Sequence, residues 1–95
     1  MLERKVEKKL TDGVRKLGGK AYKFVSPGNV GVPDRIIVWP DGKIEFVEIK
    51  SENGRLSKMQ TAQINRLQEM TCDVHILYGA DAVSAYLQAR AANGI

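Results

Sequence analysis

Cysteine, histidine and long hydrophobic runs are scarce in this 95-residue chain. The single cysteine, Cys72, excludes an internal disulfide framework and any zinc site built from several cysteines, so we expect a reducing, cytosol-like compartment. No apolar run approaches the roughly 20 residues that span a bilayer, and charge begins at Glu3, so the sequence predicts neither a membrane span nor a signal peptide. Cys72 and the lone His75 are more typical of structural than of catalytic residues.

The charge of the chain is modest but unevenly distributed. Apolar residues are 43% and charged residues 27% of the sequence, as in an ordinary globular protein, and residues 1–95 suit one domain. The net charge is +4, yet residues 1–23 alone hold eight basic and three acidic side chains. Such a segment is typical either of a solvated helix face or of a surface that binds a polyanion such as nucleic acid.

Hydrophobic periodicity predicts seven elements in the order αβββαβα. Apolar residues spaced by three and four predict an amphipathic first helix that ends at Gly18-Gly19: Leu2, Val6, Leu10, Val14 and Leu17. Alternation and turn residues predict strands over residues 21–25, 34–39, 43–50 and 74–78. Pro40-Asp41-Gly42, between the second and third strands, predicts a hairpin.

Two further helices complete this pattern. One runs from Ser57 to Met70, with inward-facing residues Ile64, Leu67 and Met70. The other covers residues 82–92, is capped by Asp81, and is anchored by Val83, Tyr86 and Leu87. The short apolar strands need cover on both faces. We therefore expect an α/β layered domain, or a domain whose open face is covered by a second subunit.

A three-residue hairpin turn would bring two carboxylates together. Position i of one strand would then pair with position 82 − i of the other, so that Asp34 lies opposite Glu48 on a face that also holds Lys50. Opposed carboxylates repel unless a cation neutralises them, and their oxygens suit Mg²⁺ or Mn²⁺. A two-residue turn would instead separate the acids onto opposite faces. Taken singly, Glu48 and Lys50 are more typical of polar strand ends.

Three segments in this order resemble the PD-(D/E)XK nuclease superfamily, and in particular its VRR-NUC (virus-type replication-repair nuclease) branch. They are Gly31-Val32-Pro33-Asp34, Glu48-Ile49-Lys50 and Leu56-Ser57-x-x-Gln60. The resemblance covers nearly the whole chain. It implies a restriction-endonuclease-like αβββαβ core with a mixed central sheet flanked by helices, plus a C-terminal helix. It also implies an endonuclease that uses Mg²⁺ or Mn²⁺ to hydrolyse DNA phosphodiesters by in-line attack.

The resemblance assigns roles to residues at the hairpin. Asp34, Glu48 and the backbone carbonyl of Ile49 would hold the metal. Lys50 would lie beside the attacking water, where it would orient or deprotonate that water and offset charge on the attacked phosphate. All four residues would therefore belong to one catalytic centre.

Roles are implied for residues outside the hairpin as well. Glu7 would be the helix acid of the metal shell, with Glu3 as its rival; ion pairs with neighbouring lysines are the alternative. Gln60 would lie at the active-site edge, although Ser57-x-x-Gln60 also matches a capping box. The candidate phosphate contacts are Lys8, Lys9, Lys23, Ser26 and Arg35.

The resemblance further implies the substrate. Stand-alone members of this kind, bacterial or phage-encoded, act on structured DNA as homodimers, and a two-fold pair of sites suits a four-way junction. The expectation is a Holliday-junction endonuclease in the host cytoplasm, dimerising through the outer face of the sheet or the last helix. The alternatives are flap or single-strand cleavage and a non-catalytic DNA-binding module on a nuclease fold. A restriction-type or transposon-type nuclease fits less well, because few loops could read bases in the major groove.

Overall fold

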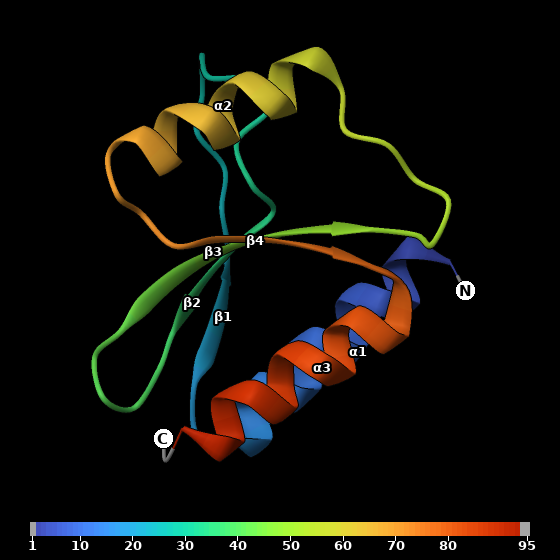
Figure 1. The fold of residues 1–95 in the computed structure, drawn as a ribbon, viewed down its shortest axis with the longest axis vertical. Coiled ribbons are helices and arrows are strands. Elements are labelled where there is room, and N and C mark those ends of the chain that lie inside the picture. The colour runs from blue at the N-terminus through green and yellow to red at the C-terminus, as the bar shows by residue number, and fades with distance from the viewer. Residues whose placement is uncertain (1, 94–95) are drawn as a thin grey trace.

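The computed structural model describes residues 2–93 and contains the predicted order of elements (Figure 1). The helices are α1 (Glu3–Lys16), α2 (Lys58–Glu69) and α3 (Gly79–Ala92). The strands are β1 (Lys20–Lys23), β2 (Arg35–Val38), β3 (Ile44–Lys50) and β4 (Val74–Tyr78). They form one sheet in the order β1-β2-β3-β4, antiparallel except for the parallel β3–β4 pair. The predicted α/β fold with a mixed central sheet is confirmed.

Helices of the chain itself cover both faces of the sheet (Figure 1). On one face α1 and α3 lie side by side over the main core, whose fully buried members include Val6, Leu10, Val14, Ile37, Val47 and Ile49. On the other face lies α2, which buries Ile64. Because strand side chains alternate, Val47 and Ile49 turn towards α1 and α3 while Glu48 between them faces the α2 side.

The first helix forms as its periodicity predicts, with a difference at its start. Val6, Leu10 and Val14 are fully buried, but Leu2 precedes the first helical turn and is 58% exposed, so its predicted place in the buried stripe is wrong. At the other end the Gly18 amide donates to the Arg15 carbonyl and the Gly19 amide to the Val14 carbonyl. Gly18 adopts a φ of +86°, which glycine tolerates, and so ends the helix where predicted.

Several predicted boundaries need correction. The first strand ends at Lys23, two residues before its predicted end. Met70 is the C-terminal cap of α2 and is 59% exposed, so it does not face inward. The last helix begins at Gly79 rather than at residue 82, because Tyr78 and not Asp81 is its N-cap. Asp81 instead lies in the first helical turn, where its charge favours the helix dipole.

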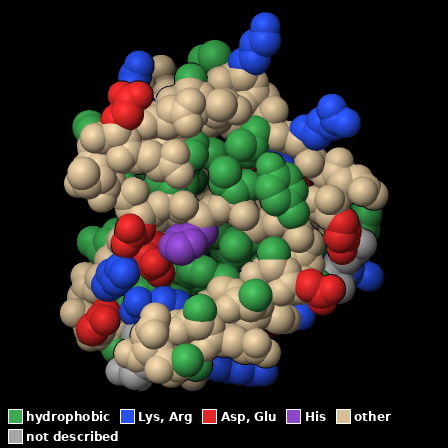
Figure 2. All heavy atoms as spheres, viewed as in Figure 1, with side chains coloured by type: hydrophobic (Ala, Val, Ile, Leu, Met, Phe, Trp, Pro, Cys, Tyr) green, Lys and Arg blue, Asp and Glu red, His purple; other side chains and the backbone are tan. Residues whose placement is uncertain are grey.

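Both edge strands of the sheet, β1 and β4, have one unpaired side within residues 2–93. β4 pairs with β3 on one side only, and Tyr78 at its end is 41% exposed. Figure 2 shows hydrophobic side chains at the surface of this view, between α2 above and the α1–α3 pair below. No helix in the described part of the chain is long and apolar enough to cross a membrane.

Candidate active site

The hairpin register brings Asp34 and Glu48 together. A three-residue turn over residues 40–42 joins β2 to β3, and Ile36 pairs with Phe46 and Val38 with Ile44, as predicted. Asp34 directly precedes β2, and its Oδ2 accepts a hydrogen bond from the Ile49 amide at 2.9 Å. No hydrogen bond among residues 2–93 uses Asp34 Oδ1, so this oxygen is left for a ligand.

Glu48 is a buried carboxylate whose surroundings disfavour its charged form. Its side chain is 1% exposed, and its Oε2 accepts a hydrogen bond from Gln60 Nε2 at 3.1 Å. The Lys50 ammonium lies 3.6 Å from the same oxygen. Oε1 is buried and has no hydrogen-bond partner within the described residues. Burial, reinforced by the nearby Asp34 carboxylate, raises the pKa of Glu48 to about 7, although Lys50 opposes this shift.

Gln60 performs both of the functions considered for it. Its Oε1 accepts from the Ser57 amide at 2.9 Å, while its own backbone amide donates to Ser57 Oγ at 3.1 Å. This capping box begins α2. The side-chain nitrogen that remains donates to Glu48. One amide therefore joins the start of α2 to the buried carboxylate.

Gly31 fixes where α2 begins relative to the sheet. Gly31, in the loop before Asp34, makes its close contact with the backbone of α2. A Cβ at this position would lie 2.5 Å from the Met59 carbonyl carbon and 2.8 Å from the Gln60 nitrogen. Its φ of +95° is also unfavourable for other residues. The loop before Asp34 and the first turn of α2 thus pack as one unit.

The two glutamates of α1 lie in different environments. Glu7 Oε1 accepts from Arg35 Nε at 2.9 Å and Nη2 at 2.6 Å, a part-buried ion pair on the α1 side of the sheet. Glu3 is the acid of α1 whose charge reaches Glu48 and raises its pKa further. The structure therefore separates the rivals: Glu7 is occupied by Arg35, and Glu3 contributes to the field at the site.

The carboxylates of this site fit a hard divalent cation. Within residues 2–93 no group of three or more His, Cys, Asp or Glu side chains is arranged to hold a metal. Asp34 and Glu48 remain, each with an oxygen that accepts no hydrogen bond. Mg²⁺ often binds through one or two carboxylates and completes its shell with water and substrate phosphates. An unpartnered buried oxygen on Glu48 is what a missing cation would satisfy.

The structure does not gather the candidate phosphate contacts around the acidic pair. Lys23 pairs with Arg35 in the sheet, so its side chain points to the α1 side and not to the face of Glu48, and Ser26 lies in the loop before β2, where its Oγ accepts from Asn29 Nδ2 at 2.9 Å. Arg35 is bound to Glu7 and to the Ala21 carbonyl rather than free to meet a phosphate. Lys8 and Lys9 lie on the outer surface of α1, and Lys8 binds Asp12 at 2.7 Å.

Sequence reasoning missed a second buried carboxylate. Glu45 is 3% exposed and accepts hydrogen bonds from three side chains: Trp39 Nε1 at 2.5 Å, Tyr86 Oη at 2.7 Å and His75 Nε2 at 3.0 Å. Burial raises the pKa of Glu45, but these three donors outweigh it and leave the pKa below its usual value. The alternation of strand side chains could have revealed this carboxylate. Residues 45 and 48 point to opposite faces of the sheet, so one of the two must face the main core.

Comparisons with known proteins identify the family and agree with the fold. A model of the VRR-NUC domain family matches residues 2–81. The chain is 45% identical over 82 residues to "Putative nuclease p44" of Acyrthosiphon pisum secondary endosymbiont phage 1, covering 86% of this chain and 88% of that protein. A solved structure of a VRR_NUC domain superposes with a TM-score of 0.85 at 28% identity, covering 90% of this chain and 94% of the other.

Proposed function

The chain belongs to the VRR-NUC family of nucleases, and on that premise we propose that it is a metal-dependent endonuclease acting on structured DNA. The observation that supports this most directly is the Glu48 carboxylate, which is buried, faces Asp34 and keeps one oxygen without a hydrogen-bond partner in the described residues. Burying a carboxylate with one oxygen unpaired costs free energy. A bound cation would offset this cost.

Asp34 and Glu48 would hold a Mg²⁺ or Mn²⁺ ion, with the Ile49 carbonyl as a further ligand. When bound, such an ion polarises a phosphoryl oxygen and lowers the pKa of a water molecule. Asp34 is oriented for this role by the Ile49 amide, and Glu48 by the Gln60 side chain. Both hydrogen bonds use one carboxylate oxygen and leave the other oxygen free for a ligand.

Lys50 is placed to act on the substrate. Its side chain is 14% exposed, and its ammonium group lies within 3.6 Å of Glu48. From there it would donate hydrogen bonds to the attacking water or the attacked phosphate and offset the negative charge that accumulates during in-line attack. No third acidic side chain in the described residues joins Asp34 and Glu48 in a metal-holding group, so we propose that Glu3 acts on the cation only through its charge and that Glu7, paired with Arg35, has a structural part.

For the substrate we propose branched DNA, with the four-way junction first. Each chain has one candidate centre, so cutting two strands symmetrically needs two copies, and the open β4 edge offers a place for them to meet. The phage origin of a relative supports the proposal that the protein acts in the cytoplasm of a bacterial host. Flap and single-stranded DNA are the alternative substrates within the same chemistry.

Incubation of the purified protein with labelled junction, flap, single-stranded and plain duplex DNA tests this proposal. We expect cleavage with Mg²⁺ or Mn²⁺, none with EDTA, and a preference for the junction. The matched control is Glu48→Gln, which keeps the size of the side chain and the Gln60 contact but removes the ligand charge. Metal-independent binding without cleavage of any substrate would instead identify a DNA-binding module.

A further inference from the structure

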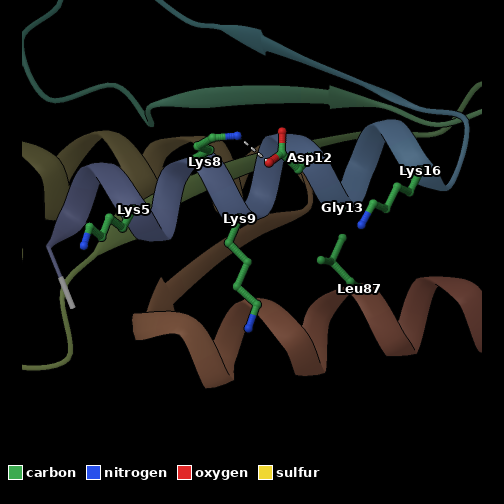
Figure 3. Close-up of a pocket in the computed structure, with 7 residues that line it drawn as sticks. All are labelled: Lys5, Lys8, Lys9, Asp12, Gly13, Lys16 and Leu87. Carbon is green, nitrogen blue, oxygen red and sulfur yellow. Dashed lines mark hydrogen bonds and ion pairs between the residues drawn. The ribbon is translucent and has the colours of Figure 1, made fainter.

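A groove runs along the outer surfaces of α1 and α3, away from the candidate active site (Figure 3). It encloses a volume of about 550 Å³ and is lined by four lysines of α1 and by Leu87 of α3. The lysines are Lys5, Lys8, Lys9 and Lys16. A second hollow, lined by residues of α1 and β1, has a volume of only about 80 Å³.

Gly13 allows the Leu87 side chain of α3 to lie directly against α1 in the groove. A Cβ on Gly13 would lie 2.2 Å from Leu87 Cδ1, so a larger residue would displace that side chain. Lys5, Lys9 and Lys16 follow one another at spacings of four and seven, which places them along one side of α1. At a rise of about 1.5 Å per residue they span roughly 16 Å of helix.

The charge of the groove is not neutralised by the protein. Asp12, the one acidic residue that lines it, binds Lys8 at 2.7 Å and Arg15 at 2.9 Å, and its pKa is lowered first by the Lys8 hydrogen bond. Lys5, Lys9 and Lys16 make no ion pair within residues 2–93. Since like charges at i, i+4 such as Lys5 and Lys9 repel, the row favours an anionic partner.

The position of the groove relative to the active site limits which part of a nucleic acid could bind in it. The core residues of α1 and α3 pack on the sheet face opposite the one on which Gln60 of α2 meets Glu48. One straight segment of nucleic acid therefore cannot occupy both the groove and the active site. The groove nevertheless starts at the N-terminal end of α1, near the end of β3 (Figure 1), so a second segment leaving a branch point would meet it.

We propose that the groove lined by Lys5, Lys9 and Lys16 binds the sugar–phosphate backbone of a second arm of the DNA, across the sheet from the strand that is cut. This inference rests on the proposed function, because it assumes a branched substrate. It assigns the basic N-terminal segment to positioning of the substrate rather than to the catalytic centre. Phosphate contacts of this kind carry no sequence preference, which suits a structure-selective enzyme.

The test compares K5Q/K9Q/K16Q with a control of equal charge, K20Q/K43Q/R66Q, which changes β1, the hairpin and α2. Binding is measured in EDTA over a range of salt concentrations, to junctions with long arms and with arms too short to reach the groove. For long arms the groove variant should reduce the slope of log affinity against log salt by about 2 to 3, at roughly 0.9 per lost phosphate contact. It should lose at least tenfold in affinity at moderate salt, and clearly less for short arms, while the control changes little.

Lysine acetylation followed by mass spectrometry gives an independent readout. Long-armed DNA should protect Lys5, Lys9 and Lys16 of the unmodified protein but not Lys43, and short-armed DNA should not protect them. Equal reactivity with and without DNA would overturn the groove proposal, even if the protein cleaves junctions. Equal loss of affinity for long and short arms would also overturn it. If the protein cuts no DNA, the nuclease proposal fails while this protection pattern still reports on the groove.

Discussion

At the scale of single residues, the burial of Glu48 predicts an unusual pH dependence of stability. Its pKa is about 7 in the folded chain against an ordinary value of 4.5, so between these values the folded state binds more protons than the unfolded state. The stability of the metal-free protein should therefore fall by ~2–3 kcal/mol as the pH rises from 5 to 8. Thermal unfolding in EDTA, followed by circular dichroism, measures this loss.

Two additions to that experiment identify its cause. Glu48→Gln should remove most of the dependence and melt at a higher temperature than the unmodified protein at pH 8, although it should no longer cleave DNA. Mg²⁺ or Mn²⁺ should restore stability at pH 8 in the unmodified protein, because a cation that binds only the folded state stabilises it. A stability that rises between pH 5 and 8 in EDTA would contradict the assignment.

Substitutions of the two glutamates of α1 should have different effects. Glu7→Gln breaks the part-buried pair with Arg35 and should cost about 1–2 kcal/mol of stability, with a smaller loss of activity. Glu3→Gln should leave the melting temperature unchanged but weaken metal binding and reduce cleavage at least tenfold. Melting curves and titrations of cleavage rate against Mn²⁺ distinguish the two. The reverse pattern would return the catalytic role to Glu7.

At the scale of elements, the contact between the loop before β2 and α2 controls the position of Gln60. Gly31→Ala should push α2 away and reduce cleavage, with a stability loss of about 2 kcal/mol or more from left-handed backbone strain and overlap together. Gly28→Ala is the matched control. It has a similar φ of +82° but no atom within 4 Å of its Cβ, so it should show the strain alone. Equal effects on activity would mean that the α2 contact is unimportant.

Contacts between elements that a short turn connects could be predicted from the sequence. Contacts that depend on how distant elements pack together could not. The meeting of Asp34 and Glu48 follows from a single three-residue turn, and strand parity then decides their face. The Glu7–Arg35 pair depends on how α1 rotates over the sheet, and the Glu45 cluster depends on α3. The local sequence pattern specifies neither the rotation of α1 over the sheet nor the position of α3. The start of α3 was misplaced because Asp81 suits a cap and a first turn equally well.

At the scale of the whole molecule, the β4 edge of the sheet predicts self-association, because the other edge strand, β1, carries Lys20 and Lys23, whose charges oppose pairing. β4 exposes unpaired backbone groups and Tyr78 beside it, a combination that proteins usually cover. Sedimentation at micromolar concentration should show a dimer, and a Tyr78→Lys substitution should shift it towards monomer and reduce paired cuts on a junction. Gln88→Lys on the exposed side of α3 is the control for added charge. A monomer at all concentrations would remove the two-site account of junction cleavage.

The proposed role of Glu48 would make catalysis depend on the first turn of α2, because the Gln60 amide both caps that turn and donates to Glu48. End turns fray more readily than the core, and α2 buries only Ile64 against the sheet. When its first turn opens, Glu48 loses the donor that orients it while the packing under α1 and α3 persists. Warming would then switch the enzyme off reversibly, several degrees below the temperature at which the chain loses its fold.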